Sequence, residues 1–192
     1  MEAYSKDTIE KLGNAIIYLA DRVPDLSKTK LLKLIYLLEE MSVKKNKLPF
    51  FGIPFEVWKA GPVAKTLFID LSSDLNMLQN YISVVKDDGR AYITAKSTFN
   101  DDEFSDADME IMDLIIDKFG NKTATELVAY LHKTGSPWLT LAQQHRLIEL
   151  FDLGITNSSD VKIDMTCFLS ESEKERYNQK LEFDYSIAHL KP

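Results

Sequence analysis

The chain has 192 residues, 45% of them hydrophobic and 28% charged, which is the composition of an ordinary globular domain and excludes a disordered chain. The net charge of −7 is uneven: residues 1–66 carry 11 Lys and Arg against 8 Asp and Glu, giving +3, and residues 67–192 carry −10. This distribution excludes a uniformly basic nucleic-acid-binding surface and favours a basic partner for the acidic part.

Two helices are predicted at the start. Ser5 precedes an apolar stripe at helical spacing, so a helix is expected from there to Pro24, which ends it. Ser27 is expected to cap a second helix over residues 28–42, whose broad apolar surface predicts a central, buried position. The lysines of this region are interpreted as a solvated rim: Lys28, Lys30, Lys33, Lys44, Lys45 and Lys47.

The next segment, residues 46–62, is expected to be packed and irregular, with a short extended piece at Phe55–Trp58. Gly61 and Pro62 are expected to cap and begin a helix over Val63–Leu71, with a second short helix near Leu75–Asn80. Asp88-Gly89, between two β-favouring runs, predicts a β-hairpin over about residues 82–93.

Capping signals predict the later helices. Ser105 with Asp108 starts a helix that ends at Gly120, and Thr123 with Glu126 starts another to about Lys133. Ser136-Pro137 is expected to open a helix over Trp138–Leu153 that stops at Gly154. The expected end of the chain is a short strand over Val161–Phe168, then a helix capped by Ser170 and Glu173 that continues through Leu181.

These elements predict a mainly α fold with one small β-hairpin. We expect a compact helical domain over residues 1–154 and a C-terminal extension over residues 155–192, packed on the same domain.

No catalytic, metal or cofactor site is expected. The glycines follow no phosphate-binding pattern, and His132, His145 and His189 are too widely spaced for a local metal cluster. A nucleophilic pair of Cys167 with His145 is one alternative, but Cys167 lies in an apolar run and is expected to be a buried hydrophobe.

An acidic cluster surrounds the start of the helix at Ser105. It could bind a hard cation, but it lacks the spacing of a calcium loop, so we interpret it as a solvated loop and a possible partner surface. Its residues are Asp101, Asp102, Glu103, Asp106 and Asp108.

The cellular location is inferred from absences. Residues 1–11 are charged, the chain has a single cysteine, and its longest apolar stretch, Leu31–Leu38, is interrupted and far shorter than a bilayer span. We therefore expect a cytoplasmic protein that does not enter a membrane.

Three segments together resemble the Panacea domain, which is the SocA-like antitoxin domain that is often labelled phage-associated. They are Lys30–Tyr36, Phe55–Val63 with its Trp-x-x-Gly-Pro-Val element, and residues 105–138, and the resemblance covers about residues 8–150. The residues that match the family's motifs are Lys30, Lys33, Tyr36, Trp58, Gly61, Pro62, Val63, His132, Pro137 and Trp138. For each of these residues, a role in the scaffold is favoured over partner contact.

The resemblance implies a protein-binding antitoxin without enzymatic activity, whose partner is a toxin of a bacterial or phage toxin–antitoxin pair. Two alternatives remain open: a proteolytic adaptor that delivers a client to a AAA+ protease, as one family member does, and a DNA-binding regulator that uses Lys28, Lys30 and Lys33. Nucleic acid is the less favoured partner, and the sequence does not fix the oligomeric state.

Overall fold

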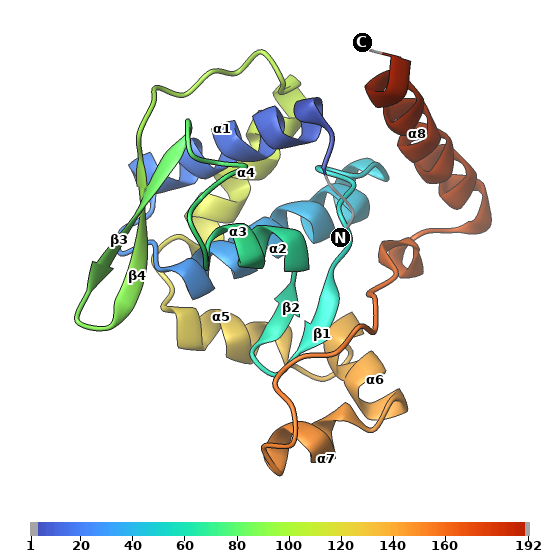
Figure 1. Cartoon of the computed structure of the whole chain (residues 1–192). Coiled ribbons are helices and arrows are strands. Elements are labelled where there is room, and N and C mark those ends of the chain that lie inside the picture. The colour runs from blue at the N-terminus through green and yellow to red at the C-terminus, as the bar shows by residue number, and fades with distance from the viewer. Residues whose placement is uncertain (1–3, 191–192) are drawn as a thin grey trace.

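The computed structural model describes residues 4–190 and confirms the mainly α fold (Figure 1). The helices are α1 (Lys6–Arg22), α2 (Lys28–Asn46), α3 (Lys65–Asp70), α4 (Asp106–Phe119), α5 (Ala124–Leu131), α6 (Pro137–Gln144), α7 (Leu147–Asp152), the 3₁₀ turn η1 (Met165–Phe168) and α8 (Glu171–Leu190). The strands are β1 (Glu56–Trp58), β2 (Gly61–Val63), β3 (Ile82–Asp87) and β4 (Arg90–Ala95).

Helix α2 is the centre of the molecule, as its broad apolar surface predicted. Every residue from Lys30 to Glu40 is buried, and the helix contacts α4, α5, β2, β4 and η1. Figure 1 shows the other elements arranged around it. A helix that is covered on all sides buries its charged residues as well as its apolar ones, and this determines the chemistry of the site described below.

The predicted capping residues start their helices. The side chains of Ser5, Ser27, Ser105, Thr123 and Ser136 each accept a hydrogen bond from a backbone N–H in the first turn of the helix that follows. At α4 and α5 the capping box is complete. These contacts are local, so the sequence alone was enough to place them.

The predicted hairpin is β3–β4, which pairs Ile82 with Ala95 and turns at Asp88-Gly89, where both residues have positive φ. The fold also contains a second, smaller hairpin, which forms a separate sheet. In this hairpin β1 pairs with β2, so that Glu56 lies opposite Val63, and residues 161–163 run beside β1 through the bonds from Val57 N to Val161 O and from Ile163 N to Phe55 O.

Two helix predictions in the middle of the chain are wrong. Gly61 and Pro62 do not begin a helix: they belong to strand β2, and α3 begins only at Lys65. Residues 75–80 form turns and bends in place of a helix. The reason is Asp70, whose buried carboxylate accepts hydrogen bonds from the backbone N–H groups of residues 76, 77 and 78 and so holds them in a turn.

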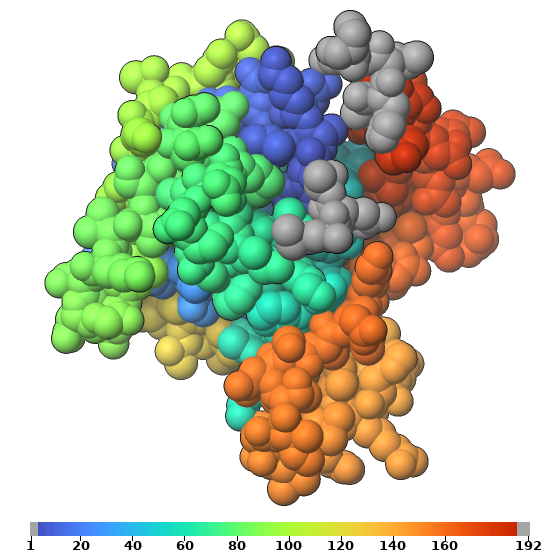
Figure 2. Space-filling view, viewed as in Figure 1, coloured from blue at the N-terminus to red at the C-terminus, as the bar shows by residue number. Residues whose placement is uncertain are grey.

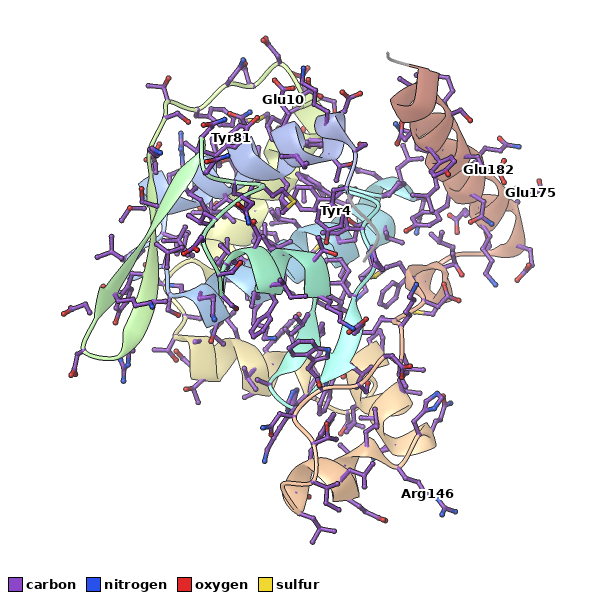
Figure 3. All side chains as sticks on the ribbon, in the orientation of Figure 1. Tyr4, Glu10, Tyr81, Arg146, Glu175 and Glu182 are labelled. Atoms are coloured by element: carbon purple, nitrogen blue, oxygen red, sulfur yellow. The ribbon has the colours of Figure 1, made fainter. Side chains whose placement is uncertain are left out.

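The predicted helix over Trp138–Leu153 is two helices, α6 and α7. They are separated at Arg146, which adopts a left-handed conformation (φ 54°). In Figure 3, Arg146 lies at the outer edge of the part of the molecule formed by α6 and α7. The turn allows Leu147 and Phe151 to enter the core. The predicted strand over residues 161–168 is also wrong: Lys162 forms only an isolated bridge with Glu56, and Met165–Phe168 forms η1.

Helix α8 continues to Leu190, beyond the predicted end at Leu181. It begins beside η1 and lies at one edge of the molecule in Figure 2. Tyr177 is buried, Leu181 packs against the core, and Lys47 forms an ion pair with Glu173 at 3.8 Å. Further along the helix, Phe183 and Tyr185 are exposed.

Candidate functional site

Residues from three distant parts of the chain converge at the turn end of the β1–β2 hairpin. Lys33 comes from α2, Gly61 and Pro62 from β2, and His132 and Trp138 from the end of α5 and the start of α6. We call these five residues, together with Trp58, the motif cluster. All six are among the family-motif positions quoted from the sequence.

Lys33 is the most unusual member, because only 1% of its surface is exposed. Its Nζ donates a hydrogen bond of 2.8 Å to the backbone oxygen of Pro62. Burial lowers the pKa of Lys33 to about 7, since the charged form loses its hydration. The ammonium group thus joins α2 to β2 and is hidden from solvent.

Gly61 allows this close approach. Its φ is +97°, and a Cβ built on it would lie 3.3 Å from Lys33 Nζ and 3.5 Å from His132 Nε2. A side chain at this position would be strained by the backbone and would also crowd Lys33 Nζ.

His132 and Trp138 stack face to face, with ring centroids 3.5 Å apart and an angle of 4° between the ring planes. Trp138 is buried, and its Nε1 donates a 2.9 Å hydrogen bond to the backbone oxygen of Trp58. His132 is the C-cap residue of α5. Desolvation and the nearby Lys33 lower the pKa of His132 to about 4, so its imidazole is neutral near pH 7. Its Nε2 has no hydrogen-bond partner among the described residues.

The remaining motif residues lie around the cluster. Lys30 is buried and donates a 2.7 Å hydrogen bond to Pro24 O. The Tyr36 ring packs edge-on against Phe55 with centroids 5.2 Å apart, Val63 is buried in β2, and Pro137 is the first residue of α6.

The interpretation of the α2 lysines as a solvated rim is therefore wrong for two of them. Lys30 and Lys33 are 4% and 1% exposed and bond backbone oxygens. They cannot reach the phosphates of a duplex, which removes most of the motivation for a DNA-binding surface at this helix.

The five residues of the acidic cluster have unequal surroundings. Asp101, Asp102, Glu103 and Asp106 are exposed, but Asp108 is partly buried. Its carboxylate closes the capping box with Ser105 and lies 3.2 Å from Lys11 Nζ. Asp108 therefore has a structural role, and the other four carboxylates face solvent.

The expectation that Cys167 is buried is wrong: it is exposed in η1. Desolvation of the sulfur, with Asp164 and Glu40 nearby, raises the pKa of its thiol, which is opposite to an activated thiolate. His145 is exposed at the end of α6, and the side chain of His189 lies outside the described residues. Within residues 4–190, no group of three or more His, Cys, Asp or Glu is placed to hold a metal ion.

Sequence reasoning missed Glu39. This carboxylate is fully buried in α2 and accepts hydrogen bonds from the backbone N–H groups of Phe50, Phe51 and Gly52 at 2.8–3.2 Å. Burial raises the pKa of Glu39 to about 7 despite these three donors. Its position directly after the apolar run that ends at Leu38 was the available signal, because a helix buried all round includes its charged residues.

Comparison with known proteins agrees with this arrangement. Residues 31–139 match the family described as antitoxin SocA-like, Panacea domain, and this match spans more than half of the chain. The chain therefore belongs to the SocA-like Panacea domain family. No curated protein and no solved structure matches it.

Membership in this family supports an antitoxin-like role in general and suggests a protein partner. The matched region contains the whole motif cluster and ends just after Trp138, so α7, η1 and α8 lie outside it. No helix in the described part of the chain is long and apolar enough to cross a bilayer.

Proposed function

We propose that this protein is a cytoplasmic antitoxin that neutralises a toxin protein by direct, stoichiometric contact. The observation that carries the proposal is the burial of the motif cluster in a chain of this family. Lys33, Gly61, Pro62 and Trp138 are buried and bond or pack against one another, which supports a role as a common frame. A frame of this kind leaves partner selection to exposed surfaces around it.

The exposed acids of the 101–106 loop are the first such surface. The loop is held by the bond from Asn100 N to Asn14 Oδ1, by the Phe99–Tyr18 ring contact and by an Asn100–Asp102 side-chain pair. A preorganised acidic loop loses little entropy on binding and attracts a basic partner over a long range. We propose that it contacts a basic surface of the toxin.

The first test is a rescue assay. Each open reading frame that flanks the gene is induced in a surrogate bacterium with and without this chain, and rescued pairs are tested for co-elution. Rescue with a stable complex supports direct neutralisation. Absence of any toxic neighbour, or rescue without contact, contradicts it.

The acidic loop is tested by the triple variant D101N/D102N/D106N, which leaves Asp108 in place. We expect association with the rescued toxin to slow about tenfold at low salt, with little effect at high salt, because the change removes long-range attraction. The matched control is D117N/E149Q/E175Q, which removes the same charge from α4, α7 and α8. All three carboxylates are exposed, and Glu175 points away from the body of the molecule in Figure 3. Equal slowing in both variants would contradict a specific role for the loop.

A proteolytic adaptor is the second candidate. The exposed aromatic side chains Phe183 and Tyr185, 60% and 68% exposed on α8, favour it because they offer an apolar contact outside the family-matched region. An adaptor shortens the half-life of the bound toxin in cells, whereas masking leaves the toxin intact or protects it.

A further inference from the structure

A pocket of about 300 Å³ opens beside the motif cluster, between the first turns of α2, the tip of the β1–β2 hairpin and α3. Its walls include the apolar side chains of Leu32, Trp58, Val63 and Phe68, and the exposed residues Thr29 and Lys59 lie among its lining. The volume is at the lower end for small-molecule sites and suits one large side chain of a binding partner.

The walls of this pocket are already fixed. The Trp58 ring packs edge-on against Phe68 with centroids 4.9 Å apart, and its Nε1 donates a 3.0 Å hydrogen bond to Glu56 Oε2. The backbone oxygen of Trp58 receives the Trp138 indole N–H, and Lys59 N donates to Asn157 O. A pocket held in this way requires little rearrangement on binding, which is the property of the anchor pockets found at protein interfaces.

The charge around the pocket is opposite to that of the molecule as a whole. Lys59 is exposed at its edge, and Lys28 Nζ lies 4.7 Å from the centroid of the Phe68 ring that forms one wall. Glu56 is the nearby carboxylate, but it is 8% exposed and is occupied by the Trp58 indole and, at 4.0 Å, by Lys65. A ligand that approaches this opening therefore meets two lysines in a chain of net charge −7.

We propose that this pocket binds an acidic segment of the partner protein, which inserts one large apolar side chain into the pocket against Trp58 and Phe68. Carboxylates on either side of that side chain pair with Lys28 and Lys59. An aromatic anchor contributes the largest buried area at such a site, and the flanking ion pairs supply orientation and specificity. The inference rests on the proposed function only in taking the partner to be a protein.

The test uses a defined probe and needs no toxin. A capped pentapeptide Asp-Glu-Phe-Asp-Glu is titrated into the full ¹⁵N-labelled chain, and the Trp58 indole resonance is followed by NMR. We expect saturable shifts with a Kd in the range of about 0.1–1 mM, which is typical of an isolated anchor segment. Exchange of the anchor for alanine in the peptide should abolish the shifts.

Two pairs of variants locate the site. Thr29→Tyr fills the pocket from the exposed second position of α2 and should weaken binding at least about tenfold, whereas Thr125→Tyr, at the second position of α5, should not. Lys59→Glu should weaken binding, whereas Lys86→Glu on the exposed part of β3 should leave it unchanged. All four side chains are exposed, so the variants are expected to remain folded.

Three results would overturn the proposal: no shift of the Trp58 resonance at about 5 mM peptide, equal binding of a Lys-Lys-Phe-Lys-Lys peptide, or preferential binding of oligouridine, which would identify a base-stacking site. The outcome is separate from that of the rescue assay. Peptide binding without rescue contradicts only the proposed antitoxin function, and rescue without peptide binding contradicts only the pocket.

Discussion

At Gly61 the backbone conformation and the side-chain packing impose the same requirement. The residue has φ +97°, and a Cβ on it would crowd Lys33 Nζ at 3.3 Å and contact His132 Nε2 at 3.5 Å, which are the two polar atoms at the centre of the motif cluster. The family motif therefore has a physical explanation at this position: a glycine is what allows the hairpin, the buried lysine and the histidine to meet.

Gly61→Ala is expected to lower the free energy of unfolding by about 2–3 kcal/mol, of which about 1–2 kcal/mol is backbone strain. Gly89→Ala is the matched control, because Gly89 also has positive φ (74°) but faces open space. Urea denaturation of both variants separates the two contributions. Equal losses would show that the contacts of Gly61 with Lys33 and His132 add nothing.

His132 gives the cluster a dependence on pH. Its pKa in the folded chain is about 4, below the ordinary value of about 6.5. Between these values the unfolded chain binds a proton that the folded chain does not, so acidification favours unfolding. Relative to His132→Phe, which keeps an aromatic ring on Trp138, the wild-type chain should lose stability as the pH falls from 6.5 toward 4. Urea unfolding at several pH values measures this, and a difference that stays constant with pH would contradict it.

At the scale of single elements, α2 shows how a buried helix uses its charged residues. Lys30 and Lys33 bond the backbone of the segments on one side, at Pro24 and Pro62, and Glu39 binds the loop at residues 50–52 on the other. Lys33 and Glu39 satisfy backbone polar atoms that would otherwise lie unpaired in the interior, and Lys30 holds the carbonyl of the exposed Pro24. The helix is therefore an organising element for two irregular segments.

Glu39→Gln is expected to destabilise the fold by about 2–3 kcal/mol, because the amide turns an N–H donor toward backbone donors that need an acceptor. Hydrogen exchange at the amides of Phe50–Gly52 should rise at the same time. Glu40→Gln is the control on the same helix, since Glu40 is also buried but its partner is Lys44 and not the loop, so exchange at residues 50–52 should not change. Unchanged exchange at residues 50–52 in Glu39→Gln would show that the carboxylate does not hold the loop.

The elements that the sequence predicted correctly are those with local causes. Ser5, Ser27, Ser105 and Thr123 cap helices through atoms two or three residues away, and Asp88-Gly89 forms its turn by itself. The errors have tertiary causes. Asp70 converts residues 75–80 into a turn through bonds from six to eight residues away, and β2 forms at Gly61-Pro62 because β1 lies beside it.

At the scale of the whole molecule, the family resemblance identified the residues of the motif cluster but not their contacts. Lys33, Gly61 and His132 are far apart in the chain. Only the folded structure shows that Lys33 Nζ and His132 Nε2 both lie next to Gly61. The central position of α2 was predicted, yet its lysines were interpreted as solvated. A helix that is covered on all sides cannot keep all of its lysines in solvent, and the structure shows that Lys30 and Lys33 are buried.

The molecule presents two exposed surfaces of opposite charge around a buried frame. The 101–106 loop is acidic, whereas the pocket lined by Trp58 and Phe68 has Lys59 at its edge and Lys28 over the Phe68 ring. Two surfaces of opposite sign fix the orientation of a partner better than one, because a reversed partner places like charges together. We therefore expect a toxin with separate basic and acidic faces.

The central claim, neutralisation by direct contact, is tested most directly by titration of purified toxin with the purified chain while the toxin's own activity is followed. Direct masking predicts that inhibition is complete at a fixed molar ratio, with no protease present and with the toxin recovered intact on dissociation. Inhibition that appears only when a AAA+ protease is added, together with loss of the toxin, would contradict masking and establish the adaptor mechanism in its place.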